Sequence, residues 1–210
     1  GKSFAIGEGG ILITDDRTIL EKAMLWGHYE RHSEISDEIK GDAGALPWGG
    51  YKYRIHQLSS VVGRLQIKKY AAEIEEIDQA MKYFWSELEG LPAVKICYPK
   101  DEGSTKSGWY ASKAFYNSEE VQGLSIERFV EAVRAEGVAI SAGANRPLHR
   151  HPLFDSVDIY GHGAATANLY MPEGVKVRDI TGELPVTDAA NSRIFSEPWF
   201  KKYQPEKIAV

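Results

Sequence analysis

The sequence predicts an α/β fold built around a buried core. Apolar residues make up 43% of the 210 residues and charged residues 26%, an ordinary globular composition that argues against disorder. Short β-branched apolar runs alternate with segments in which apolar residues recur every three to four positions. Because strands that alternate with helices are typical of α/β layers, these patterns favour that class.

The first 27 residues predict a turn, a strand and a helix. The glycines of residues 7–10 favour a tight turn, and the apolar run of residues 11–14 is typical of a buried strand. Asp15 or Asp16 can cap the next helix, because a short carboxylate accepts the unpaired amide protons of a first turn. The apolar period of this helix ends at Gly27.

A long irregular stretch separates this helix from a much longer one. Residues 28–50 show no period and hold several glycines, which predicts a loop. Between Ile55 and Leu91, apolar residues keep to helical faces. The apolar residues before and after residues 68–72 fall on different faces of a single helix, so we expect a kink or two helices there. The helical zone ends at Gly90 and Pro92.

The last part of the chain predicts a smaller set of strands and helices. Ser125 is the expected cap of one helix, and Thr187 is a candidate cap for a last one. The expected strands are residues 94–97, 109–116 and 138–140, and the last helix is expected within residues 185–198.

Charge and cysteine content exclude several classes of protein. A net charge of −5 disfavours indiscriminate nucleic-acid binding. The single cysteine, Cys97, excludes an internal disulfide framework and fits a reducing, cytoplasmic environment. No apolar run approaches the ~18 residues of a membrane span, and no secretory leader is apparent. We therefore expect neither a nucleic-acid nor a membrane partner.

A few residues could carry chemistry. Lys2 could form a covalent bond with a carbonyl-bearing cofactor, although a lysine near a chain terminus is ordinarily just solvated. The glycines of residues 7–10 lack the following Lys-Ser/Thr of a phosphate-binding loop. His149 and His151 could ligate a metal, but no third ligand stands at suitable spacing, so we expect no metal site.

Four segments, in order, resemble the DegT/DnrJ/EryC1/StrS aminotransferases. Each is a weak motif alone, but together they span nearly the whole chain. The first runs from Lys2 through Glu8-Gly9-Gly10 to Leu25-Trp26-Gly27-His28, and the second is Gly50-Tyr51-Lys52-Tyr53-Arg54-Ile55-His56 before the long helix. The third is Arg146-Pro147-Leu148-His149 with Pro152-Leu153-Phe154, and the fourth is Leu184-Pro185-Val186-Thr187 with Phe195-Ser196-Glu197-Pro198.

This resemblance implies the C-terminal portion of a fold type I enzyme that uses pyridoxal 5'-phosphate. Residues 1–55 would complete the large cofactor-binding domain, residues 56–92 would form a linking helix, and residues 93–210 a small α/β domain. In the family, nearly half of the enzyme precedes the lysine. An upstream segment or chain is therefore expected to supply the groups that contact the pyridine ring.

The resemblance also implies roles for individual residues. Lys2 would hold the cofactor and move a proton in catalysis, and Lys52, where most members carry asparagine, would meet the cofactor phosphate across a homodimer with shared active sites. His28, Arg54 and His149 would bind substrate. From residue chemistry alone, these cations could equally form solvated ion pairs, and His149 could be a hydrogen-bonded loop histidine.

The activity implied by the resemblance is transfer of an amino group to a keto-sugar, often a nucleotide-linked one, or to a similar cyclic ketone. Glutamate or glutamine would be the amino donor by analogy. Two alternatives stay open. One is a pyridoxal phosphate-dependent sugar dehydratase of the same fold; such relatives replace the lysine with histidine, so Lys2 argues against it. The other is a non-catalytic binding or regulatory module.

Overall fold

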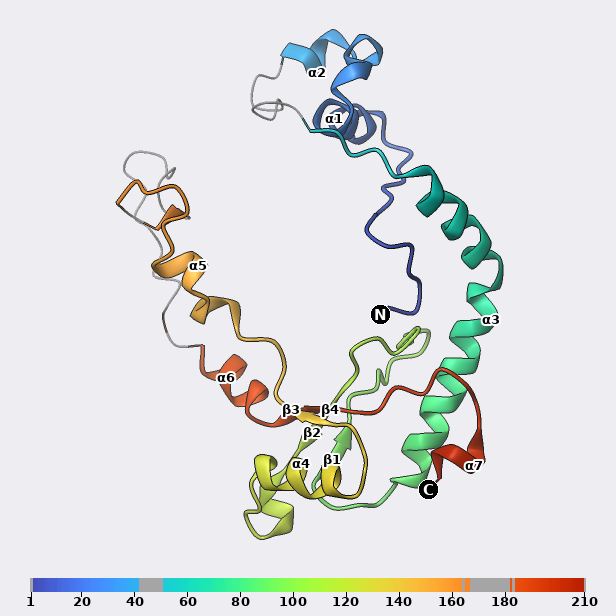
Figure 1. Cartoon of the computed structure of the whole chain (residues 1–210), viewed down its shortest axis with the longest axis vertical. Helices are drawn as coiled ribbons and strands as arrows, with labels where there is room; N and C mark the ends of the chain where they lie inside the picture. Colours follow the sequence, from blue (N-terminus) through green and yellow to red (C-terminus); the bar gives the residue numbers. More distant parts are fainter. Residues whose placement is uncertain (1, 42–50, 164, 167–181, 183, 210) are drawn as a thin grey trace. The chain divides into compact units, whose positions relative to one another are not determined.

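A computed structural model describes residues 2–41, 51–163, 165–166, 182 and 184–209 (Figure 1). The chain divides into two compact units, residues 1–72 and residues 73–210. The boundary falls within one long helix, and each unit has its own buried cluster of side chains. The three-part division expected from the sequence, 1–55, 56–92 and 93–210, stays a prediction.

Helix α1 (Arg17–Gly27) organises the first unit. The Asp16 carboxylate accepts hydrogen bonds from the amides of Thr18 and Ile19, at 2.8 and 3.2 Å, which confirms the predicted cap. Two short helices follow where the sequence predicted a loop, a 3-10 helix η1 (Tyr29–Glu34) and α2 (Asp37–Gly41). Residues 42–50 of that predicted loop lie outside the described residues. Met24, Leu25, Ile35 and Ile39 form the buried cluster of this unit.

The predicted strand at residues 11–14 is wrong. No strand is assigned there, and the side chains of Ile11 and Ile13 are 90% and 86% exposed. A strand exists only through hydrogen bonds to a neighbouring strand, and among the described residues none pairs with this segment. Residues 11–14 have the composition of a buried strand, but among the described residues no neighbouring strand forms hydrogen bonds with them.

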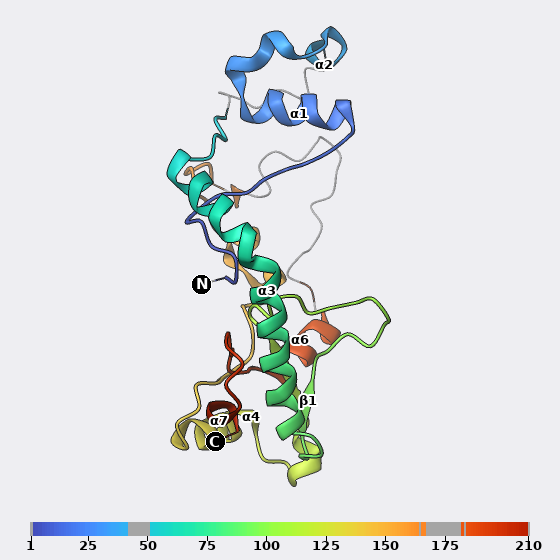
Figure 2. The same cartoon turned by 90° about the vertical axis from the view of Figure 1, so that its right-hand side faces the viewer.

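Helix α3 (Gln57–Glu87) is a single continuous helix (Figure 2). The alternative of two helices is therefore wrong. Its C-terminal half contributes Ile77 and Met81 to a buried cluster with Trp109 in the second unit. Its N-terminal half, in the first unit, leaves Leu58 and Leu65 of the predicted apolar face exposed.

A four-stranded antiparallel sheet forms the centre of the second unit (Figure 1). The sheet order is β1 (Val94–Ile96), β2 (Lys113–Tyr116), β4 (Ile194–Ser196) and β3 (Ser141–Ala142). Helix α4 (Ile126–Ala135) is capped by Ser125, as predicted, and covers one face of the sheet. Its Val130 packs with Tyr116 and Phe195 in the core.

Several predicted boundaries in this unit are wrong for local reasons. Strand β2 is shorter than residues 109–116, because Trp109 and Ala111 adopt positive φ angles of 54° and 52°, outside the extended region. Residues 138–140 form no strand, and β3 begins just after them. Helix α6 (Pro185–Asn191) starts after Leu184 without a side-chain cap, so Thr187 is not its cap. Strand β4 occupies the end of the stretch predicted as helix. The remaining elements are η3 (Ser118–Val121), η4 (Leu148–Arg150), α5 (Pro152–Asp155) and α7 (Pro205–Ile208).

Candidate active site

The segment that carries Lys2 lies along one face of α3 in the first unit. The Ser3 hydroxyl is 3.0 Å from the hydroxyl of Tyr70, and the rings of Phe4 and Tyr70 meet edge to face with centroids 5.1 Å apart. The Ala5 amide donates to Gln66 Oε1 at 3.2 Å, and Gln66 Nε2 donates back to the Ala5 carbonyl. The backbone next to Lys2 is therefore anchored, while the Lys2 residue itself is exposed.

The structure brings His28, Lys52 and Arg54 together at the end of α1. His28 and Lys52 form an antiparallel β-bridge, and the Tyr53 amide donates to the Gly27 carbonyl at 2.8 Å. A side chain at Gly27 would lie 3.2 Å from the Tyr53 ring, so the close approach of the two segments suits glycine. Two stretches 24 positions apart in the sequence thus meet at one place.

The Glu30 carboxylate lies among these side chains. Arg54 NH1 lies 3.1 Å from Glu30 Oε1. A backbone hydrogen bond from its own residue, together with the positive charges of Arg54, Lys52 and His28, holds the pKa of the Glu30 carboxyl below its ordinary value. Lys52 and Arg54 are both permanent cations, and phosphates and carboxylates are the groups that such side chains bind.

Three aromatic rings form an exposed stack beside these cations. Trp26 stacks on Tyr51 at 5.9 Å between centroids, and Tyr51 stacks on Tyr53 at 5.4 Å. All three are at least 42% exposed. Lys52 stands between Tyr51 and Tyr53 and forms the isolated β-bridge to His28. The stack therefore holds the residues on either side of Lys52.

His149 lies in the second unit, apart in the sequence from the other predicted site residues. Its Nε2 is 3.6 Å from Asp188 Oδ1 and accepts a hydrogen bond from Arg150 Nε at 3.3 Å. The Arg150 guanidinium also donates to Asp188 at 2.6 Å. His149 is thus hydrogen-bonded, although it lies in η4 rather than in a loop, and its role toward substrate stays a prediction. His151 caps α5, its Nδ1 accepting from the Leu153 amide at 3.2 Å.

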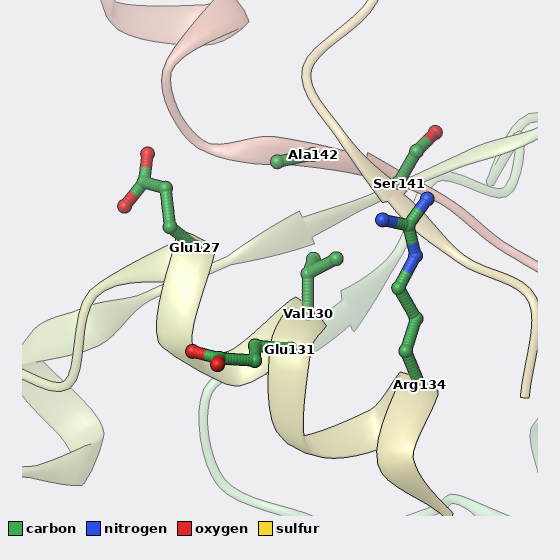
Figure 3. A pocket seen from close by; sticks show the side chains of 6 residues that line it. All are labelled: Glu127, Val130, Glu131, Arg134, Ser141 and Ala142. Atoms are coloured by element: carbon green, nitrogen blue, oxygen red, sulfur yellow. The ribbon is translucent and has the colours of Figure 1, made fainter. Parts of the chain in front are cut away.

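A surface hollow of about 460 Å³ lies between α4 and β3 (Figure 3). Glu127 and Glu131 line it from successive turns of α4, and Arg134 reaches along it to donate to the Ile140 carbonyl at 2.7 Å. It contains none of the residues predicted to bind cofactor or substrate. The residues for which the sequence predicts such roles lie in the first unit and, for His149, in η4.

Sequence reasoning missed a buried charge pair in the second unit. The Glu197 side chain is 1% exposed, and its Oε1 lies 4.0 Å from Lys106 Nζ. Lys106 donates to the Ser112 hydroxyl at 2.5 Å and lies over the Trp109 ring. Burial raises the pKa of Glu197 and lowers that of Lys106. No spacing rule links residues 91 positions apart, so the sequence held no signal for this pair.

The anchors of the Lys2 segment were also missed, although they carry a signal. Gly63, Gln66 and Tyr70 follow the helical spacing of three and four, which marks one face. No cluster of three or more metal-ligating side chains occurs in the part of the chain that is described. Within the same residues, no helix has the length and apolar character needed to cross a membrane.

Comparison with known proteins gives a family for this arrangement. A model of the DegT/DnrJ/EryC1/StrS aminotransferase family matches residues 1–178. The uncharacterised protein MJ1066 of Methanocaldococcus jannaschii is 24% identical over 77% of this chain and 42% of its own length. EpsN of Bacillus subtilis, named as a pyridoxal phosphate-dependent aminotransferase, is 25% identical over 73% of this chain and 36% of its own. The chain thus spans less than half the length of either relative.

Two solved structures share the fold. A doubly substituted ColD matches with a TM-score of 0.55 and 15% identity, covering 93% of this chain and 48% of that chain. A GDP-4-keto-6-deoxymannose-3-dehydratase, solved with a trapped pyridoxal phosphate-glutamate geminal diamine, matches with a TM-score of 0.56 and 13% identity, covering 94% and 47%. These likenesses confirm the predicted fold class, a partial fold type I structure with mixed helices and sheet.

Proposed function

Because the chain belongs to the DegT/DnrJ/EryC1/StrS aminotransferase family, we propose that it is part of a pyridoxal phosphate-dependent aminotransferase that acts on a keto-sugar or a similar cyclic ketone. The observation that carries this proposal is the family match itself. It includes Lys2, His28, Lys52 and Arg54 within one compact unit.

The residues of the first unit fit this cofactor. A cofactor aldehyde needs an accessible amine, and Lys2 is exposed at the end of an anchored segment. A cofactor phosphate needs cations, and Lys52 and Arg54 supply two next to the carboxylate of Glu30. The remaining groups, those that contact the pyridine ring, we assign to a further segment or chain.

When bound, the cofactor supplies an electron sink for the carbon that loses its proton. The Lys2 amine would hold it by a covalent bond to its aldehyde carbon. With glutamate or glutamine as amino donor, the free Lys2 amine would take the donor's α-proton as a base and return it as an acid. The same steps in reverse would aminate the ketone.

The other candidate site residues have different roles in this proposal. Lys52 would hold the cofactor phosphate of a second subunit, so that each active site of a homodimer is shared. A lysine acts as a point charge, so it can replace the asparagine that most family members carry. His28 and Arg54, next to it, would meet the polar groups of the substrate, and His149 would contribute from η4.

A sugar dehydratase is the second candidate function. One of the solved structures with this fold is named as a dehydratase. Against it stands Lys2 itself, because an amine can hold the cofactor covalently, whereas the histidine of dehydratase relatives cannot. The two activities differ in product: an aminotransferase leaves nitrogen on the sugar, whereas a dehydratase removes a hydroxyl group.

Borohydride reduction tests the proposal. The complete protein is loaded with pyridoxal phosphate, reduced and mapped by peptide mass spectrometry. The expected result is a pyridoxyl adduct on Lys2, and its loss in Lys2→Ala, with Lys22→Ala as the matched control. Incubation of the holoenzyme with keto-sugars and glutamate should then yield an amino sugar. An adduct only on another lysine, or a deoxy product without nitrogen, contradicts the proposal, and a protein that binds no cofactor supports the non-catalytic alternative.

A further inference from the structure

We propose that Gln66 and Tyr70 of α3 are positioning residues that set the place of the Lys2 amine. This inference rests on the proposed function of Lys2 as the cofactor lysine. It is carried by the set of contacts that fasten the chain on the C-terminal side of Lys2 to a single face of α3.

The contacts follow one another in order along the two elements. Ser3 meets Tyr70, and Ala5 meets Gln66. A side chain placed at Gly63 would contact the Ile6 side chain at 3.4 Å, and one placed at Gly7 would lie 4.0 Å from Ser59. The N-terminal segment therefore runs antiparallel to α3. Successive residues of the segment match the helix positions 70, 66, 63 and 59, which share one face.

These contacts fix the register of the segment against α3 at several points rather than at one.

Gln66 holds the segment through both polar atoms of its amide. Its Oε1 accepts from the Ala5 amide at 3.2 Å, and its Nε2 donates to the Ala5 carbonyl. A primary amide that pairs with both backbone groups of one residue acts as a neighbouring strand would. These two hydrogen bonds prevent the segment from sliding along α3 or rotating about its own axis at Ala5.

Tyr70 supplies the last anchor before the lysine. Its hydroxyl lies 3.0 Å from the Ser3 hydroxyl, and its ring meets Phe4 edge to face at 5.1 Å. Ser3 is the residue next to Lys2, so the anchored backbone ends within one residue of the reactive side chain. An amine that must first bind the cofactor and then carry a proton depends on position, since a shift of about 1 Å can cost about 10²-fold in rate.

The test uses the complete holoenzyme and variants that change contacts but little shape. Gln66→Met keeps the length of the side chain and removes both hydrogen bonds. Tyr70→Phe removes only the hydroxyl. Gln79→Met is the matched control. Gln79 is an exposed glutamine of the same helix and lies beyond helix positions 59–70, which meet the segment. Thermal unfolding of each variant shows that the fold is kept.

Three readouts separate a positioning role from a purely structural one. Hydrogen exchange at the Ala5 amide should become about thirtyfold faster in Gln66→Met, since two net hydrogen bonds of about 1 kcal/mol each are lost. The kcat value should fall at least tenfold in Gln66→Met, and less in Tyr70→Phe, with KM within twofold. The pH midpoint of the visible absorbance of the bound cofactor should shift in both variants and stay unchanged in Gln79→Met.

Each outcome decides the inference. If reduction labels Lys2 but kcat and the absorbance midpoint of Gln66→Met equal those of the wild type, the inference is wrong and the proposed function stands. Faster Ala5 exchange with unchanged kcat and absorbance likewise contradicts a positioning role. If reduction labels another lysine, the proposed function fails as well. Should Gln66→Met not fold, the kcat and absorbance shifts of Tyr70→Phe decide alone.

Discussion

The Glu21 carboxylate on α1 accepts two hydrogen bonds from Ser36, from its amide at 3.0 Å and from its hydroxyl at 2.5 Å. Arg17 donates to the other carboxylate oxygen at 2.5 Å. Glu21 is buried, at 3% exposure, and joins the start of α2 to α1 across the 3-10 helix. The hydrogen bonds from Ser36, and then that from Arg17, lower the pKa of this carboxyl to about 2.

Glu21 should therefore contribute acid-sensitive stability. A carboxyl with a lowered folded-state pKa stabilises the fold above its unfolded value of 4.5, and this contribution is lost as the pH falls from 4.5 toward about 2. Glu21→Gln should lower the free energy of unfolding at pH 7, and the difference from the wild type should shrink below pH 4.5. Urea unfolding at a series of pH values measures it. A difference that does not vary with pH would contradict the prediction.

Trp109 should be a major stabilising residue of the second unit. Its side chain is 1% exposed, and its indole N–H donates to Asp78 of α3 at 2.9 Å. Trp109→Phe removes this hydrogen bond and leaves Asp78 Oδ1 without its indole donor. The free energy of unfolding should fall by about 1–3 kcal/mol. Thermal unfolding measures the loss. Trp26→Phe, at a 42% exposed position, is the control and should cost much less.

The buried Glu197 carboxyl should make stability fall with rising pH. Because burial raises the pKa of Glu197, the folded state holds this proton more tightly than the unfolded chain. The stabilisation is complete below pH 4.5 and is lost as the pH rises through the folded value. In Glu197→Gln, which cannot ionise, this decline should disappear. Lys106→Met should be more damaging than Glu197→Gln at pH 7, because it leaves a buried carboxylate without its cation. Equal losses would argue against a charge pair.

The shared-site role of Lys52 predicts complementation between inactive subunits. Lys52→Ala should weaken retention of pyridoxal phosphate without unfolding the protein, because one phosphate-binding cation is lost. Lys2→Ala should abolish covalent attachment. A heterodimer of the two variants keeps one site with both lysines, so a mixture should regain activity that neither variant shows alone. Heterodimers that form but recover nothing would contradict the assignment of Lys52.

Local rules predicted what depends on neighbours in the chain. The caps of Asp16 and Ser125 follow from side chains that reach amides two or three residues away. The long helix follows from a repeated apolar spacing, and the predicted division into two helices is absent because the α-helix continues from Gln57 to Glu87. The family, and with it the fold class, was also recognisable from motifs in the sequence. The roles of Lys2, Lys52, His28, Arg54 and His149 remain predictions.

The sequence by itself thus determined helices α1, α3 and α4, the caps of α1 and α4, the family and the set of candidate residues. Only the tertiary structure decided which segments pair. It left residues 11–14 without a ladder, bent the chain at Trp109, and brought Lys52 beside His28 and Glu197 beside Lys106. Helix caps depend on atoms a few residues apart, so a short window of sequence contains them. Strand pairing and buried charge pairs depend on distant segments meeting, and a linear pattern does not specify which ones do.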